Sequence, residues 1–200
     1  THQKNPATEN IETPHLSHSS ALLENLLQWD ENEQIKPIES GQTIRNTYCL
    51  ESKIGSGGMG EVWKALDLIQ DAGDAKDINV AIKFIKHEIR SHPDILKALV
   101  REFARYKKLI HPNIVKAYEL NRDNNDIFIV MEYLQGGALK EFIKEHPKGI
   151  SLAQARPIIK GMCSALEYAH NEGIVHLDFK PGNVFYDPET QTCKVIDFGI

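Results

Sequence analysis

Apolar residues recur with two different spacings along this chain. Short extended runs with strand-like alternation are found at 48–58, 60–66, 79–86, 114–120 and 126–132. Between the third and fourth runs the spacing is helical, with Leu96, Val100 and Phe103 on one face after a start signal at Ser91–Pro93. The polar, acidic stretch 69–79 predicts a hairpin loop. This part of the chain therefore predicts five strands and one main helix.

The remainder of the chain, 135–200, is predominantly helical by the same criterion. The spacing predicts a short helix at 138–145 and a long helix at 151–171, for which Ser151 is a suitable N-cap. Pro157 inside the second pattern predicts a kink or a later start, because proline lacks the amide hydrogen of a helix interior. Two short strands are then expected, at 183–186 and 193–196.

Residues 1–47 differ from the rest in charge and texture. They hold seven acidic and three basic residues, and so carry most of the chain's net charge of −5. The first 20 residues are polar and predict disorder. Residues 21–29 (ALLENLLQW) predict a short amphipathic helix, which either docks on the surface of the following domain or binds a partner. We therefore expect an N-terminal extension that a regulatory partner could use.

Composition excludes several classes of protein. A net charge of −5 argues against a broadly basic nucleic-acid binder. No apolar run approaches the roughly 20 residues that a membrane span needs. The three cysteines, Cys49, Cys163 and Cys193, are widely spaced and form no CxxC pair, which favours a reducing compartment over a disulfide framework.

A glycine-rich motif, GSGGMG, joins the first two predicted strands. Gly55, Gly57 and Gly60 match the GxGxxG spacing that dinucleotide-binding proteins also use, but there the glycines open a helix. Here residues 61–66 alternate like a strand. A glycine-rich hairpin lying over phosphates fits better, because its backbone amides can approach anions without side-chain obstruction. An ordinary hairpin turn is the alternative.

A lysine lies inside the apolar run VAIK, at Lys83. A lysine in a buried strand is costly unless its ammonium group finds an anion, although a solvent-facing lysine is the simpler interpretation. Glu102 falls on or beside the buried face of the predicted main helix. A Lys83–Glu102 pair would hold the lysine for nucleotide phosphates.

Two further motifs carry polar residues at fixed spacing, HLDFKPGN from His176 and DFG from Asp197. A carboxylate at Asp178 could accept a proton from a substrate hydroxyl, and Lys180 could stabilise charge on a transferred phosphoryl group. Asn183 and Asp197 could supply oxygen ligands to Mg²⁺. A polar loop by chance is the alternative, and the joint spacing argues against it.

Together these motifs resemble the protein kinase family, in family order, from about Tyr48 to Ile200. The GGMGEV glycine loop and Lys180 are similar to bacterial serine/threonine kinases. The resemblance implies a bilobal α+β fold with a five-stranded antiparallel small lobe at 48–134, one main helix in that lobe, and the beginning of a helical large lobe at 135–200. It also implies ATP and Mg²⁺ as cofactors, and transfer of the γ-phosphoryl group to Ser or Thr hydroxyls of protein substrates.

The resemblance further implies a role for each matching residue. The catalytic residues would be Asp178, Lys180, Lys83 and Glu102, and the metal ligands Asn183 and Asp197. Nucleotide contacts would come from Ile54, Gly55, Gly57, Gly60, Val62, Ala81, Lys83, Met131, Glu132, Leu134 and Phe185. Tyr106, Ala117, His176 and Phe198 would stack as the family's regulatory spine; simple core packing would account for these apolar residues equally well.

The sequence departs from the family pattern at two points. Leu177 replaces the arginine that normally pairs with an activation-loop phosphate, so we hypothesise that activation does not depend on that pairing; alternatively Leu177 fills a hydrophobic gap. The chain also stops just after DFG, before any activation segment. It is then either part of a longer kinase or a minimal effector kinase that depends on a partner.

Alternative functions follow from the same observations. A chain without an activation segment could be a non-catalytic ATP-binding scaffold. A small-molecule phosphotransferase is a weaker alternative, because such enzymes generally lack a lysine at the position of Lys180 and a true DFG. The expected location is the bacterial cytosol, or the host cytosol for a secreted effector.

Overall fold

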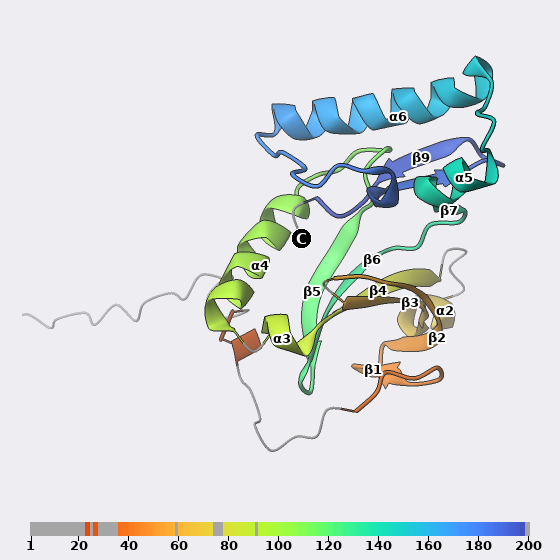
Figure 1. Ribbon diagram of the computed structural model, residues 1–200. Helices are drawn as coiled ribbons and strands as arrows, with labels where there is room; N and C mark the ends of the chain where they lie inside the picture. Colours follow the sequence, from red (N-terminus) through yellow and green to blue (C-terminus); the bar gives the residue numbers. More distant parts are fainter. Residues whose placement is uncertain are drawn as a thin grey trace, which may run out of the picture.

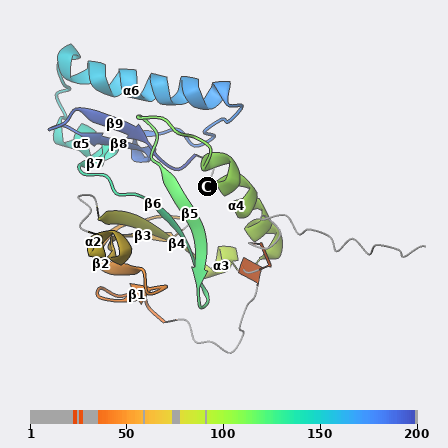
Figure 2. The same ribbon diagram turned by 180° about the vertical axis from the view of Figure 1, so that it is seen from behind.

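Two antiparallel β-sheets, each accompanied by a long helix, make up the chain in the computed structural model (Figure 1). The structure describes residues 23–24, 26–27, 36–58, 60–73, 78–90 and 92–198. The larger sheet and α4 (Pro93–Tyr106) form the small lobe. The smaller sheet and α6 (Leu152–Asn171) form the large-lobe portion, and α6 lies at the end of the molecule away from the larger sheet (Figure 2).

Six strands build the small-lobe sheet, in the order β1-β2-β3-β4-β6-β5, and every neighbouring pair is antiparallel. They are β1 (Thr43–Ile44), β2 (Tyr48–Ser56), β3 (Gly60–Asp67), β4 (Asn79–Ile85), β5 (Ala117–Asp123) and β6 (Asp126–Glu132). The five predicted strands are present. The sixth, β1, has two residues and comes from the segment that we expected to precede the lobe.

Strand β4 lies in the middle of this sheet, and its residues alternate between two apolar layers. Val80, Ile82 and Phe84 pack in one cluster with Ile44 and residues of β2, β3 and β6. Ile85 points to the other layer, which contains α4. Since side chains alternate along a strand, Lys83 lies on the α4 side, and this placement brings it toward the large lobe.

Helix α4 covers one face of the sheet as its periodicity predicts. Pro93 occupies its first turn, where a missing amide hydrogen does no harm. The buried residues Leu96, Val100, Phe103 and Tyr106 follow at spacings of three and four, which places them on one face. A short helix, α3 (His87–Arg90), precedes it.

The predicted loop after β3 begins with a helical turn instead, α2 (Leu68–Ala72). The cause is local: Asp67 accepts hydrogen bonds from the backbone amides of Ile69 and Gln70 at 3.0 and 3.1 Å. Residues 74–77, which complete the predicted loop, lie outside the described residues.

The large-lobe portion contains a three-stranded sheet in the order β7-β8-β9. Its elements are β7 (Gly137–Ala138), α5 (Leu139–Glu145), α6, the 3₁₀ turn η1 (Pro181–Asn183), β8 (Val184–Asp187) and β9 (Thr192–Val195). Ser151 caps α6 in a capping box with Gln154. The helix starts at Leu152 and includes Pro157, so the predicted later start is wrong.

Helix α6 packs closely on β9. A Cβ atom on Gly161 would lie 2.8 Å from the Cβ of Cys193, so a larger residue would push the helix away from the strand. The segment before β5 also runs along β9: the amide of Val115 donates to the carbonyl of Val195 at 3.0 Å, and the amide of Val195 donates to Asn113 at 2.8 Å. These bonds join the two lobes and fix the strand that leads to Asp197.

The N-terminal segment contributes to the small lobe. Leu26 is 2% exposed and belongs to the same apolar cluster as Ile85 and Leu96. Ile44 is also buried, in the cluster on the opposite face of the sheet. The packing of Leu23 and Leu26 agrees with docking of this segment on the domain, one of our two interpretations. Residues 1–22, 25 and 28–35 lie outside the described residues, and with them the prediction of disorder for the first 20. Among the described helices, none is long and apolar enough to cross a membrane.

Candidate active site

The glycine motif forms the turn between β2 and β3, so it joins two strands and does not open a helix. The amide of Gly57 donates to the carbonyl of Gly60 at 2.8 Å. Gly60 must be a glycine, because a Cβ atom there would lie 1.7 Å from the carbonyl oxygen of Phe84 on β4. The motif is therefore part of a hairpin, as both of our interpretations require, and its contact with phosphates stays a prediction. Met59 lies outside the described residues.

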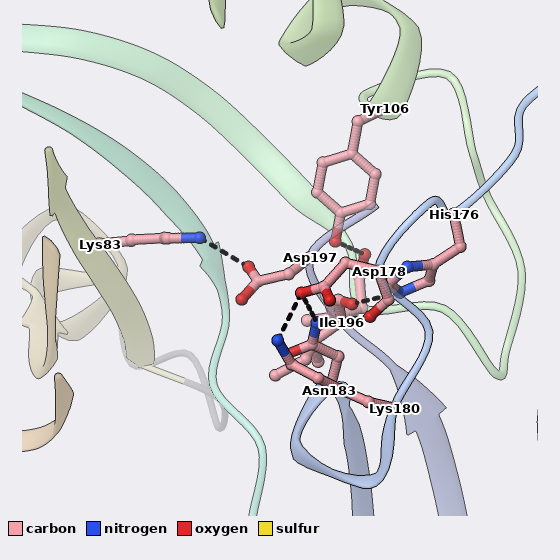
Figure 3. A network of polar contacts seen from close by, with 9 residues as sticks. Lys83, Tyr106, His176, Asp178, Lys180, Asn183, Ile196 and Asp197 are labelled. Carbon is pink, nitrogen blue, oxygen red and sulfur yellow. Dashed lines mark hydrogen bonds and ion pairs between the residues drawn. The ribbon is translucent and has the colours of Figure 1, made fainter. Parts of the chain in front are cut away.

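The ammonium group of Lys83 pairs with the carboxylate of Asp197, with Nζ 2.7 Å from Oδ1 (Figure 3). Lys83 is buried, and this contact joins β4 of the small lobe to the residue just after β9. Asp197 adopts a left-handed backbone conformation, φ 58°, which is uncommon for a residue with a side chain. The cost expected of a buried lysine is thus offset by an acidic partner.

That partner is not Glu102, and the predicted Lys83–Glu102 pair is wrong for this conformation. The carboxylate of Glu102 is half exposed and pairs with Arg105, three residues on in the same helix, at 3.2 Å. The sequence pattern correctly placed Glu102 beside the buried face of α4, but a local arginine competes for its carboxylate.

The loop after α6 brings Asp178, Lys180 and Asn183 together. The ammonium group of Lys180 lies 2.6 Å from Oδ2 of Asp178. Nδ2 of Asn183 donates to the same oxygen at 3.0 Å and to the backbone carbonyl of Asp178 at 2.9 Å (Figure 3). The Asp178 carboxylate is largely exposed and therefore open to a substrate.

These contacts stabilise the ionised form of Asp178. The hydrogen bond from Lys180 is the main cause that lowers the pKa of the Asp178 carboxyl, and the hydrogen bond from Asn183 adds to it. The carboxylate therefore stays ionised to a lower pH than an unpaired aspartate would.

Three aromatic rings connect this loop to α4. The ring of Phe198 stacks on Tyr106 at 6.1 Å and lies 4.6 Å from His176. His176 is bound to the carbonyl of Ile196 at 3.0 Å, and Tyr106 donates to the carbonyl of Val115 at 2.7 Å (Figure 3). Ala117 belongs to the same apolar cluster as Tyr106 and Phe198. The four predicted spine residues are therefore in one buried region, next to Asp197.

Asn183 and Asp197 are the described residues that could hold a metal ion here. The amide of Ile196 donates to the backbone carbonyl of Asn183 at 3.0 Å, so the two candidate ligands come from adjacent segments. The nitrogen of the Asn183 side chain is engaged with Asp178, which leaves its oxygen for a cation. One carboxylate and one amide oxygen suit Mg²⁺, which keeps several other ligands from waters and phosphates. In the described part of the chain, no group of three His, Cys, Asp or Glu residues could hold a metal.

The residues expected around the adenine come from five strands and the segment after β6. Ala81 and Met131 are paired directly across β4 and β6, and Gly55 opposes Val62 across β2 and β3. Ile54 is exposed at the end of β2. Glu132 ends β6, and Leu134 follows it and packs against the apolar cluster of α4. Phe185 lies on β8 of the large lobe.

Lys194 is a residue of this region that the sequence reasoning missed. Its ammonium group binds both carboxylate oxygens of Glu132, at 2.8 and 2.9 Å. The signal was present in the sequence, because Lys194 interrupts the apolar pattern of a short strand that ends just before Asp197. Leu177, in contrast, is 86% exposed, so it fills no hydrophobic gap among the described residues.

Comparison with known proteins agrees with this geometry. The sequence matches the protein kinase domain family over residues 48–200. The serine/threonine-protein kinase PrkC of Bacillus subtilis is 37% identical over 164 residues, which cover 80% of this chain and 24% of PrkC. The serine/threonine-protein kinase PknA of Mycobacterium tuberculosis is 33% identical over 165 residues, 80% of this chain and 36% of PknA. The chain thus spans between about a quarter and a third of these relatives.

The fold is also found in a solved structure. The crystal structure of the PknI kinase domain from Mycobacterium tuberculosis matches with a TM-score of 0.68 at 24% identity, over 82% of this chain and 63% of that one. The predicted bilobal fold is thereby confirmed, with a sixth short strand in the small lobe.

Proposed function

Because the chain belongs to the protein kinase family, we propose that it carries the phosphotransfer site of a serine/threonine protein kinase, which moves the γ-phosphoryl group of ATP to protein hydroxyls. The single observation that carries this proposal is the contact set Lys83–Asp197 and Asp178–Lys180–Asn183, in which both charged pairs lie at hydrogen-bond distance. Relatives that cover most of this chain are named serine/threonine-protein kinases.

Each residue of the site has a role that its chemistry supports. Asp178, exposed and ionised, would orient the acceptor hydroxyl and take its proton. Lys180 would stabilise negative charge on the transferred group, and Lys83 would orient the phosphates. Catalysis of this kind depends mainly on positioning and charge stabilisation.

ATP and Mg²⁺ are the proposed cofactors. Asn183 and Asp197 would hold the metal ion, which neutralises charge on the phosphates when bound. The glycine hairpin, Ala81, Met131, Glu132, Leu134 and Phe185 would surround the nucleotide. The reacting protein substrate would supply a Ser or Thr hydroxyl next to Asp178. A regulatory partner for residues 1–47 and a cytosolic location belong to the same proposal.

A non-catalytic ATP-binding scaffold is the second candidate, and the site residues weigh against it. Asp178, Lys180 and Asn183 are present in one contact set, and Lys83 and Asp197 in another. A scaffold without catalysis could have lost such residues. The small-molecule phosphotransferase is disfavoured by Lys180 and by the DFG sequence.

The decisive experiment is Asp178→Asn in the full-length protein, assayed with radiolabelled ATP and a mixture of protein substrates. We expect transfer to fall by about 10²- to 10⁴-fold, because the general base is removed, while ATP affinity is unchanged. Asp187→Asn is the matched control: that carboxylate accepts a hydrogen bond from Thr190 at 2.6 Å at the far end of β8. Retained transfer in Asp178→Asn would reject the assigned role, and an unaltered protein that binds ATP but transfers nothing would favour the scaffold.

A further inference from the structure

A charged pair connects the two lobes at the segment where the adenine is expected to bind. Glu132 is the last residue of β6, and Lys194 lies on β9 of the large lobe. Nζ of Lys194 lies 2.8 Å from Oε1 and 2.9 Å from Oε2 of Glu132, so the ammonium group bridges both oxygens. The side chains are only 16% and 27% exposed. Limited solvent screening makes this pair stronger than a surface pair.

The pleat of the large-lobe sheet explains where Lys194 points. Val184 and Tyr186 on β8, and Cys193 and Val195 on β9, are buried in the apolar clusters under the helices. Lys194 alternates with these residues, so it lies on the opposite face. Its direct partner across β8 and β9 is Phe185, the expected floor of the adenine site. Lys194 and Phe185 therefore share the face that is turned away from α6.

Glu132 is also held by the segment before β5, in addition to β6 and β9. The backbone amide of Lys116 donates to Oε2 of Glu132 at 3.1 Å, and the amide of Glu132 donates to the carbonyl of Lys116 at 2.9 Å. The carboxylate thus joins β6, the segment before β5 and β9. A carboxylate with this many partners has little freedom, and the backbone at the end of β6 is held with it.

Strand β9 connects this pair to Asp197, the proposed metal ligand. Asp197 follows Lys194 by three positions, and both intervening residues are tied down. Val195 is bound to Asn113 and Val115, and Ile196 is bound to Asn183 and His176. The pair therefore connects one rigid segment that would contact the adenine with another that would contact the metal.

We propose that Lys194 and Glu132 are positioning residues for the nucleotide, which hold the end of β6 and the Asp197 segment in a fixed relation. A bound nucleotide would contact both segments at once. Its adenine and its metal-bound phosphates are aligned only when the distance between the end of β6 and the Asp197 segment matches the nucleotide. Neither residue touches the reacting atoms. This inference rests on the proposed function, because it assumes that ATP binds between these segments.

The test compares two ligands, adenosine and MgADP, in calorimetric titrations of the full-length protein. Adenosine reports contacts at the end of β6 alone, whereas MgADP requires both segments. In Lys194→Met and in Glu132→Gln we expect MgADP affinity to fall about tenfold, the size typical of a positioning contact outside the reacting groups. Adenosine affinity should be nearly unchanged, because Glu132 would meet the adenine through its backbone carbonyl, which both variants keep. The double variant should lose no more than either single variant, because both changes remove one interaction.

The matched control is the exposed pair Lys144–Glu141 on α5, which has a similar separation of 2.9 Å. Lys144→Met and Glu141→Gln should change neither affinity. The charge-reversed double variant, Glu132→Lys with Lys194→Glu, should recover part of the MgADP affinity. A lowered melting temperature in every variant with an unchanged ratio of the two affinities would overturn the proposal, as would a parallel loss of both ligands. If the unaltered protein binds neither ligand, the proposed function itself fails.

Discussion

At the scale of single residues, the site depends on which charged groups lie within hydrogen-bond distance. Asp178 is exposed, and an exposed carboxylate is ordinarily screened by water. Lys180 nevertheless lies 2.6 Å from it and lowers the pKa of its carboxyl group. The pairing extends the ionised range of the carboxylate to lower pH and also restrains its side chain.

The Lys180–Asp178 contact leads to a prediction about titration. In Lys180→Met the ionised form of Asp178 loses its main stabilising partner, so the pKa of this carboxyl should rise toward the ordinary value of aspartate. The carboxylate would then protonate at a higher pH on acidification. A ¹³C-detected NMR titration of the side-chain carboxyl group measures the midpoint directly.

Lys144→Met is the control for this titration, because Lys144 pairs with Glu141 on α5. The Asp178 midpoint should not move in that variant. An unchanged midpoint in Lys180→Met would mean that the 2.6 Å contact does not persist in solution.

Residue spacing predicted which residues come together better than it predicted which charged groups pair with one another. The positions of Asp178, Lys180 and Asn183 follow from one short loop, whose geometry leaves their side chains few alternatives. Glu102 has an alternative, since Arg105 lies one helical turn away and Asp197 occupies Lys83. Which partner a charged side chain binds depends on distances between elements that are remote in sequence. The spacing of residues along the chain does not give these distances.

At the scale of elements, the regular pieces were predictable because each buries one face. Strand β6 was predicted with its observed limits, 126–132, and α5 and α6 within one residue at their starts. The elements that the pattern did not predict are short. Helix α2 depends on one capping residue, Asp67, and β1 forms by pairing with β2. Such pieces bury too little apolar surface to leave a periodic signal.

The N-terminal segment gives a prediction about stability. Leu26 is 2% exposed in the cluster with Ile85 and Leu96, so Leu26→Ala would remove a buried side chain and leave a cavity. We expect the free energy of unfolding to fall by about 2–3 kcal/mol, within the range for buried leucines. Urea denaturation followed by tryptophan fluorescence measures it.

Leu27→Ala is the natural comparison, because its side chain is 37% exposed and adjacent in sequence. It should cost well under about 1 kcal/mol, as surface substitutions do. Equal, small effects of the two substitutions would show that the segment does not dock on α4 in solution.

At the scale of the whole molecule, the two lobes meet through contacts of different chemical kinds. Backbone hydrogen bonds join Val115 and Asn113 to β9, and the Glu132–Lys194 pair lies beside them. The Lys83–Asp197 pair is the one that a metal ion would disturb, because the carboxylate that binds Lys83 is also the proposed metal ligand. In this structure the two roles of Asp197 compete.

This competition predicts that Lys83 weakens metal binding when no nucleotide is present. The ammonium group lies 2.7 Å from Oδ1 of Asp197, where it occupies a ligand oxygen and repels a dication. A unit charge about 4 Å away contributes about 1 kcal/mol even in bulk water, so Lys83→Met should raise the affinity for free Mn²⁺ by about fivefold or more. Electron paramagnetic resonance of Mn²⁺ titrations measures this affinity.

MgATP affinity should change in the opposite direction, because the phosphates lose the ammonium group that orients them. In Lys97→Met, which removes the partner of the exposed Asp94 in the first turn of α4, neither affinity should change. If Lys83→Met weakened both metal and nucleotide, Lys83 would be supporting the fold of the site, and the competition for Asp197 would be disproved.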